Sequence, residues 1–402
     1  GSSSSEAASL VFFARQPHQV HDARRRFRLT PEEFQLINPN TRTCPVFRSE
    51  RDAELTKKLH RAAPVLIEEE VTDANGNVLR SERNPWDIRF TQGLFNMTSD
   101  SGLFRDAPAG PGEPNRLPLY EAKMIHQFDH RWATYVDAQG AAAEEVETAD
   151  VSPEQKADPG FVARPRYWVD EREVLARIAR VPLRVAKAWL ALHAAGTPQE
   201  ADTAMADLLL ALAAWLAGEL FNRAAGEAPA PGGWSQAQAL PHLASIEAQL
   251  KARFFILREA LRADGLTTKK ALVEFPKWAS QILEARLSDD EVAQLGEALE
   301  ASSVAPAVRE LLDGWMDRRS PRWLVGWRDI TGVEKVRTVI GTVVPRAGVG
   351  HTMPLCISAA SGPMQASMLA NWQSLGSVDI YRMLTTVQTK QMNEAKRSAN
   401  FS

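Results

Sequence analysis

The spacing of apolar residues changes twice along the chain, and this change limits the folds that the sequence can adopt. Between residues 170 and 319, apolar residues recur at the three- and four-residue spacing of amphipathic helices. Thr197 and Glu200 form a capping box that starts one of these helices. On both sides of this segment, short runs rich in β-branched and aromatic residues are typical of strands. The sequence therefore predicts an α+β fold, in which a mixed strand-and-helix region is interrupted by a large all-helical block.

Four segments follow from this pattern. The acidic composition of residues 141–158 is typical of an exposed linker or a mobile loop. After the helical segment, strand-forming runs return at WLVGWRDI and VRTVIGTVV. We expect an N-terminal α+β region over residues 1–140, an acidic linker over 141–169, the helical block over 170–319, and a β-rich basic region with an atypical tail over 320–402.

Tryptophans are scattered through the helical block. At helical spacing, tryptophan usually packs in the core of a bundle, so we expect these residues to be buried rather than to line a ligand cage. Two of the helices are predicted over residues 243–261 and 272–287. The tryptophans concerned are Trp189, Trp215, Trp234, Trp278 and Trp315.

Composition restricts the class of protein. The two cysteines, Cys44 and Cys356, are far apart, which argues against a disulfide framework or a cysteine zinc site and favours the reducing cytoplasm. The longest apolar run, residues 208–217, is much shorter than the ~20 residues that span a bilayer, so no membrane association is expected. Because the chain begins with Gly rather than Met, we expect it to be a piece of a longer protein.

The charge balance differs between the whole chain and its last segment. The net charge of −3 does not indicate a chain that binds nucleic acid over its whole surface. From residue 321 to the end, however, nine Lys or Arg residues face four Asp or Glu residues. This local positive excess favours a surface that contacts phosphates.

The densest run of functional side chains is residues 117–135, LPLYEAKMIHQFDHRWATY, which we call the recognition stretch. Large apolar residues alternate there with charged ones, and this mixture predicts a strand over 117–124 that leads onto a surface binding a polar partner. Its hydrogen-bond donors suit phosphates and base edges, and its aromatic rings could stack on bases. The donors are Lys123, His126, Gln127, His130 and Arg131, and the rings are those of Tyr120, Trp132 and Tyr135.

Three other interpretations of this stretch stay open on the residues alone. Asp106, Glu121 and Lys123 could form a Mg²⁺-dependent nuclease site, with two carboxylates on the metal and the lysine beside the attacking water. His126 and His130 would share one face of a helix and could bind a metal, although no third ligand is evident. The polar groups could also satisfy one another at a corner between a strand and a helix.

Several blocks of the sequence resemble the C-terminal half of adenine-specific DNA methyltransferases of restriction-modification and phage-defence systems. The blocks are NPNTRTCPVFRSERDAELTKKLH, NPWDIRF, LPLYEAKMIHQFDHRWATY, RPRYWV and WLVGWRDITGVEKVRTVIGTVVPRAGVG, over residues 10–170 and 320–372. In that family, this half contains the target-recognition domain. The resemblance therefore favours DNA recognition over the nuclease.

The chain departs from this family where the methyl transfer would occur. Asn38-Pro39 is followed by Asn40, so it is not the Asn-Pro-Pro-Tyr motif that holds a flipped adenine. Asn84-Pro85 is likewise followed by Trp86, and no glycine-rich cofactor loop follows a strand. The resemblance implies that S-adenosylmethionine binds to an N-terminal methyltransferase domain or subunit outside this chain, and we expect no cofactor and no metal in this chain.

We therefore expect this cytoplasmic chain to be the DNA-recognition portion of such a methyltransferase, inactive alone and bound to double-stranded DNA. The alternative from another class is a scaffold, in which the helical block docks another defence-system subunit through an exposed apolar stripe. The expected DNA contacts are Lys123, His126, Gln127, His130, Arg131, Arg328, Arg337 and Arg346.

Overall fold

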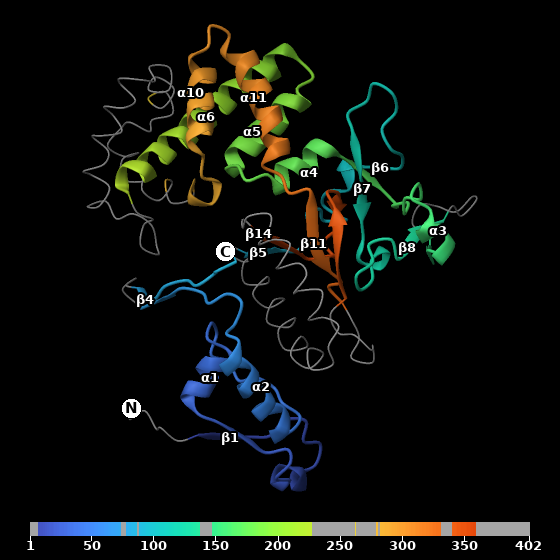
Figure 1. Ribbon diagram of the computed structural model, residues 1–402, viewed down its shortest axis with the longest axis vertical. Helices are drawn as coiled ribbons and strands as arrows, with labels where there is room; N and C mark the ends of the chain where they lie inside the picture. The colour runs from blue at the N-terminus through green and yellow to red at the C-terminus, as the bar shows by residue number, and fades with distance from the viewer. Residues whose placement is uncertain are drawn as a thin grey trace.

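The computed structural model describes residues 7–73, 78–86, 88–136, 147–226, 282–330 and 340–358, together with residues 262 and 279. Helices and sheets both contribute to these residues, so the predicted α+β class is confirmed. Figure 1 shows an N-terminal unit at the bottom, two sheets at the centre and right, and a group of helices at the top.

The N-terminal unit has its own small core. The capping box at Thr30 starts its first helix, because the Thr30 hydroxyl accepts the Glu33 N–H and Glu33 accepts the Thr30 N–H. Phe27, Leu29 and Ile37 fill the core between the strands and helices. Its elements are β1 (Ala8–Leu10) paired with β2 (Phe27–Leu29), η1 (Pro17–His21), α1 (Pro31–Ile37) and α2 (Glu50–Ala62).

A two-stranded hairpin follows the N-terminal unit in the chain. Strand β3 (Val71–Thr72) pairs antiparallel with β4 (Val78–Arg80). The guanidinium of Arg80 donates to the carbonyl oxygens of Pro39 and Glu69, which fixes the hairpin to the N-terminal unit. The pair is visible as the long blue extension beneath the helices in Figure 1.

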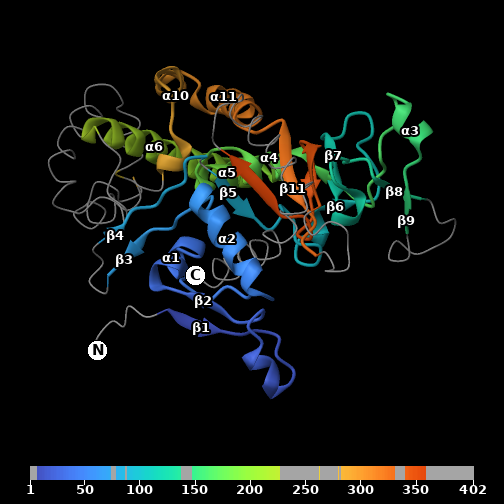
Figure 2. The ribbon, with the colours of Figure 1, turned by 60° about the horizontal axis from the view of Figure 1, so that its bottom comes forward.

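Two four-stranded sheets each combine strands from before and after the helical block, and we call them together the sheet body. In the first sheet, β13 pairs parallel with β7; in the second, β14 pairs antiparallel with β5. The labels of β7 and β11, one strand from each sheet, are close together in both Figures 1 and 2. The order is β13 (Gly348–Val349), β7 (Arg116–Tyr120), β10 (Trp168–Asp170), β6 (Phe104–Arg105) in the first sheet and β12 (Gly341–Pro345), β11 (Trp323–Trp327), β14 (Leu355–Ser358), β5 (Ile88–Thr91) in the second.

One core joins the two sheets across the sequence. Leu119 and Tyr120 from β7 pack in the same buried cluster as Leu324 from β11 and Val344 from β12. The expected boundaries at residues 140 and 320 therefore do not separate independent units, because the segments on both sides share this core. Short 3-10 turns, η2 (Ser101–Leu103) and η3 (Ala122–Met124), connect the strands of the first segment.

The prediction of an acidic linker is wrong for the described part of residues 141–169. Strand β9 (Thr148–Asp150) pairs antiparallel with β8 (Ala133–Tyr135), and a capped helix, α3 (Pro153–Ala157), follows it. Strand β10 then lies between β7 and β6 in the first sheet. Acidic side chains on exposed edges of paired strands give the same composition as a linker, which explains the error. Residues 141–146 lie outside the described part of the chain.

The helical block is confirmed where the structure describes it. Trp189, Trp215 and Trp315 are buried as predicted, and the rings of Trp215 and Trp315 pack edge to face at 5.8 Å. Trp234, Trp278 and the helix predicted over 243–261 lie outside the described residues. Of the helix predicted over 272–287, position 279 and residues 282–287 are described, and its end is the short 3-10 helix η5 instead of an α-helix that continues to residue 287. The block contains α4 (Glu171–Ile178), α5 (Leu183–Ala194), α6 (Pro198–Ala225), η5 (Ile282–Ala285), α10 (Asp289–Glu300) and α11 (Val304–Arg318).

Helix α6 is the central helix of this block. By length and composition alone its residues Pro198–Ala224 could cross a membrane, but 72% of the most apolar window is buried inside the protein. Its buried carboxylate, Glu219, accepts hydrogen bonds from Arg223 and Arg286 at 2.9 Å. In the described part of the chain no other helix passes this test, and the burial of α6 identifies it as a core helix.

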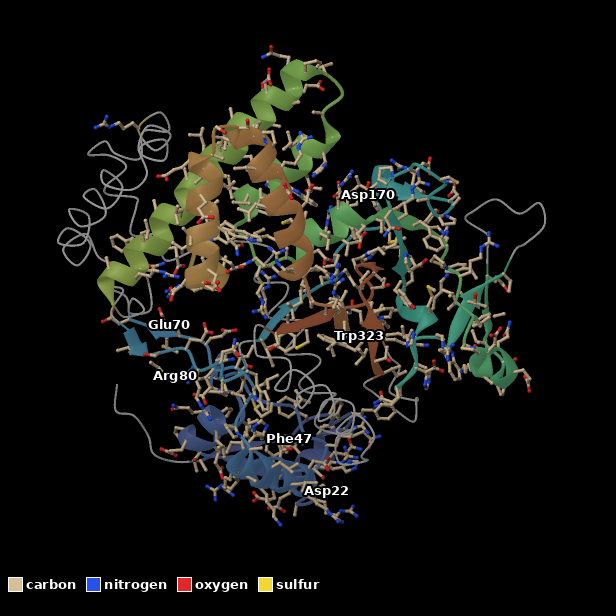
Figure 3. All side chains as sticks on the ribbon, turned by 45° about the horizontal axis from the view of Figure 1, so that its top comes forward. Asp22, Phe47, Glu70, Arg80, Asp170 and Trp323 are labelled. Atoms are coloured by element: carbon tan, nitrogen blue, oxygen red, sulfur yellow. The ribbon has the colours of Figure 1, made fainter. Side chains whose placement is uncertain are left out.

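The chain leaves the sheet body for the helical block near Asp170 and returns near Trp323, both labelled in Figure 3. Close to these crossings the two ends of the block are joined. The Arg319 guanidinium donates to the Arg180 carbonyl oxygen at 2.7 Å, and the Arg180 N–H donates to the Arg319 carbonyl oxygen at 3.3 Å. The entry and the exit of the block are therefore neighbours in space.

Candidate nucleic-acid interface

The recognition stretch leaves the sheet earlier than its sequence predicts. Strand β7 ends at Tyr120, and residues 122–124 form the turn η3 instead of continuing the strand expected to residue 124. Met124 and Ile125 are both buried, although they are consecutive, and Lys123 is exposed. Two buried neighbours cannot lie on opposite faces of one strand with a single buried face, so the chain has to turn here.

Residues 126–129 form a tight turn, which we call the display turn. The His126 N–H donates to the Asp129 carbonyl oxygen at 2.8 Å, and the Asp129 N–H donates to the His126 carbonyl oxygen at 3.0 Å. His126 and His130 therefore do not share the face of a helix, and the geometry assumed for a two-histidine metal site is wrong. Within the described ranges, no group of three His, Cys, Asp or Glu side chains could hold a metal ion.

Residues that follow the helical block in the chain bond to the display turn and to the residue before it. The Arg328 guanidinium donates to the Ile125 carbonyl oxygen at 2.9 and 2.5 Å. The Gly341 N–H donates to Gln127 Oε1 at 3.0 Å, and the Phe128 N–H donates to the Gly341 carbonyl oxygen at 3.2 Å. These bonds join positions more than 200 residues apart, so the display turn has one fixed position on the sheet body.

Two of the expected DNA contacts are thus engaged inside the protein. Gln127 is buried at the base of the display turn, and burial of Arg328 lowers the pKa of its guanidinium, which Asp150 opposes. An amide or a guanidinium that satisfies a buried carbonyl or N–H is required for the fold. We therefore interpret Gln127 and Arg328 as residues that position the display turn.

Arg131 begins the return to β8 and is half-buried. Its guanidinium donates to the carbonyl oxygens of Lys156 at 2.9 Å and Phe161 at 3.5 Å. Lys156 forms a 2.7 Å ion pair with Asp129. Burial acts to raise the pKa of Asp129, but hydrogen bonds from Lys156 and from the Arg131 N–H outweigh it, so this pKa is lowered and the pair stays ionised near neutral pH.

Glu121, one of the two carboxylates of the nuclease alternative, is hydrogen-bonded within the chain. The Tyr135 hydroxyl donates to Glu121 Oε1 at 2.5 Å, and burial together with this bond raises the pKa of Tyr135. Asp106 follows β6, which β10 separates from β7, so two strand spacings place the two backbones roughly 10 Å apart or more. Asp106 and Glu121 therefore follow strands that are not adjacent, and Glu121 is already engaged with Tyr135.

The two arginines predicted in the last segment have different positions. Arg337 lies in residues 331–339, outside the part of the chain that the structure describes. The Arg346 side chain is only 7% exposed and donates to Asp317 Oδ1 at 2.6 Å and to the Pro321 carbonyl oxygen at 3.3 Å. It joins the strand end to the C-terminus of α11, which is a structural position rather than an open surface.

The aromatic residues differ most from expectation. Tyr120 and Tyr135 are each only 4% exposed, and the Trp132 ring packs 4.4 Å from the His126 ring, with Lys156 over it at 5.0 Å. The exposed ring of the recognition stretch is Phe128, at 51%. Sequence reasoning missed it because a single Phe among polar residues has no periodicity, although its place in the polar run His-Gln-Phe-Asp is itself unusual.

His130 is predicted to remain neutral at physiological pH. Burial lowers its pKa below the usual 6.5, and Arg131 adds to this, whereas Asp129 opposes it. The stability that neutral His130 contributes is complete above pH 6.5 and is lost as the pH falls through the depressed folded-state pKa. An NMR titration of the ring should give a midpoint below 6.5, and Arg131→Met should raise it; a midpoint above 6.5 would contradict the prediction.

A neutral His130 can donate one hydrogen bond and accept another. A base edge presents both donors and acceptors, so it can use both capacities, whereas a phosphate oxygen can only accept. His130 therefore keeps the role of base reader that the sequence predicts for it, as a hypothesis.

The scaffold alternative needs an exposed apolar stripe on the helical block. Among the side chains of residues 170–224 and 285–319, Leu183 is the one large hydrophobic that is strongly exposed. The apolar residues of α5, α6, α10 and α11 pack instead into the core of the block. A single exposed leucine does not form a docking stripe on the part of the block that the structure describes.

Comparison with known proteins gives no match to any family model, any curated protein or any solved structure. The likeness to DNA methyltransferases therefore rests on the sequence blocks quoted above.

Proposed function

We propose that this chain is the DNA-recognition portion of a site-specific adenine-N6 DNA methyltransferase of a restriction-modification or phage-defence system. Its partners are double-stranded DNA and an N-terminal methyltransferase domain or subunit, in the cytoplasm. The observation that carries the proposal is that Arg328 and Gly341 hold the display turn. They come from one block that resembles this family, and the turn belongs to another.

A rigid surface of this kind suits sequence recognition. Base edges are distinguished only when donors and acceptors are held at defined positions, and a preformed surface loses little conformational entropy on binding. The bonds at Ile125, Gln127 and Phe128 supply this rigidity. Lys123 is exposed beside the display turn, with its ammonium 4.7 Å from the Tyr135 ring centroid, and it is the residue that we assign to a DNA phosphate.

The two Asn-Pro pairs of the chain are not arranged to hold a flipped adenine. The Asn84 side chain accepts the Ile88 N–H and donates to the Ile88 carbonyl oxygen, and Asn38 donates to Thr41. Both asparagines of the Asn-Pro pairs are thus engaged in local turns, with no arrangement for an adenine amino group. Methyl transfer is accordingly assigned to the partner domain, and this chain is assigned DNA binding alone.

Replacing Lys123 with alanine should weaken duplex binding about equally for all sequences. Loss of one phosphate contact should reduce the slope of log K against log salt by about 1. The measurement is an electrophoretic or fluorescence titration of duplexes with varied sequences, at several salt concentrations. The matched control is Lys58→Ala on α2, where the lysine is equally exposed but far from the recognition stretch in the sequence.

Two outcomes would contradict the proposal. Equal binding by the parent chain, Lys123→Ala and Lys58→Ala would remove Lys123 from the interface, and no binding by the parent chain would remove DNA as the partner. Incubation of plasmid with the chain and Mg²⁺ separates the nuclease alternative, because the recognition function predicts no cleavage.

A further inference from the structure

Phe128 combines two features that are individually unfavourable for a phenylalanine. Its backbone has φ = 65°, in the left-handed region, where a bulky residue is an outlier. It occupies the third position of the display turn, where positive φ usually requires Gly or Asn. Its ring is also 51% exposed to water. A smaller residue would fold more easily here, so the ring is retained at some cost to the fold.

The display turn holds the backbone of Phe128 in place. The Phe128 N–H donates to Gly341, and the neighbouring Gln127 is buried and accepts the Gly341 N–H. On the preceding side, Arg328 binds the Ile125 carbonyl oxygen. A ring on a mobile loop would lose backbone and side-chain entropy on binding, whereas here the backbone is already fixed and only the side-chain rotamers remain to be ordered.

The chemistry of the neighbouring residues favours a nucleic acid as the partner of the ring. Phe128 lies between His126 and His130 in the sequence, and Lys123 is exposed on the turn before it. Exposed rings beside cations are typical of surfaces that contact bases and phosphates together. A phenyl ring has no polar group that would need a partner inside a base stack, unlike the hydroxyl of Tyr135 or the indole N–H of Trp132.

We propose that the Phe128 side chain acts as a wedge. It inserts between two stacked bases of duplex DNA bound at the recognition stretch and stacks on the face of one of them. The inference rests on the proposed function and adds to it the way in which the duplex is deformed. Separating two stacked bases has a cost, which the new contact between the ring and the base offsets. The left-handed backbone of the display turn holds the ring in the position from which it can be inserted.

Plasmid unwinding tests the wedge directly. The 402-residue chain is bound to closed circular plasmid, topoisomerase I relaxes the complex, and the linking number is read on a gel after the protein is removed. The parent chain should leave a changed linking number, because an inserted ring unwinds the duplex. Phe128→Asn, which tolerates the left-handed backbone, should bind roughly 5- to 100-fold more weakly and, at saturation, leave no change.

Two comparison variants sharpen the test. Phe128→Trp keeps a flat ring and should keep the change in linking number. Lys123→Ala should need more protein to reach saturation but should then unwind the plasmid as the parent chain does. Binding without unwinding by the parent chain, or equal unwinding by Phe128→Asn, would overturn the wedge and leave DNA recognition intact. No binding by the parent chain would overturn both.

Discussion

Replacing Arg346 with methionine should lower the free energy of unfolding by about 3 kcal/mol, since this change removes a buried charge from its partners. Methionine keeps much of the apolar stem but leaves Asp317 and the Pro321 carbonyl oxygen without the guanidinium. Arg346 also holds the pKa of Asp317 below its usual 3.8. The deficit should therefore be complete above pH 3.8 and shrink as Asp317 takes up a proton at lower pH. Urea unfolding at several pH values measures both effects.

Arg322 is the matched control for this change. It also pairs with Asp317, at 2.7 Å, but its side chain is 66% exposed. An exposed ion pair contributes little, so Arg322→Met should cost less than about 1 kcal/mol. Equal stability of the two variants, together with weaker DNA binding by Arg346→Met alone, would restore Arg346 to the role of DNA contact that the sequence predicts for it.

Replacing Gly93 with alanine should destabilise the sheet body by on the order of 3 kcal/mol, because strain and a backbone clash coincide there. Gly93 has φ = 111°, and an added Cβ would lie 2.5 Å from the Gly350 carbonyl oxygen. The atoms that it would meet belong to the backbone, so no flexible side chain can move aside. Leu94 and Phe95 both donate to the Val349 carbonyl oxygen beside this contact, so the two halves of the sheet body would be pushed apart.

Thermal or urea unfolding of Gly93→Ala measures this effect. Gly102→Ala is the control, because no atom lies within 4 Å of its added Cβ and its φ is not in the left-handed region. The control should stay within about 0.5 kcal/mol of the parent chain. A stability of Gly93→Ala close to that of Gly102→Ala would show that the two segments do not approach each other here as closely as described.

Local features of the fold could be predicted from the sequence. The capping boxes at Thr30, Thr197 and Ser288 depend only on residues three positions apart, and all three start helices. The buried tryptophans follow equally from helical spacing. The pairing of β7 with β13 could not be predicted in the same way, because its two strands are separated by the whole helical block and no local window contains both.

The recognition stretch could be singled out from the sequence. Which of its residues face an outside partner and which bond within the protein could not be predicted. Donors such as Gln127 and Arg346 bond equally well to a phosphate, a base or a protein carbonyl, so residue type does not decide which partner they have. The early end of β7 had a signal in the consecutive apolar pair Met124 and Ile125, which interrupts the alternation of a strand. The position of Phe128 depends on Gly341, far away in the chain, and its place in a polar run was the one local signal.

The contact between Arg180 and Arg319 also has a kinetic consequence. The sheet body can form only when segments on both sides of the helical block meet. These two arginines are 139 positions apart in the sequence, so closing the unfolded chain between them is entropically unfavourable. Once the helices have packed through contacts that are closer in sequence, the two arginines are neighbours and the intervening chain no longer counts as a loop. We therefore expect the helices to assemble before the strands, with the sheet body and its display turn completed last.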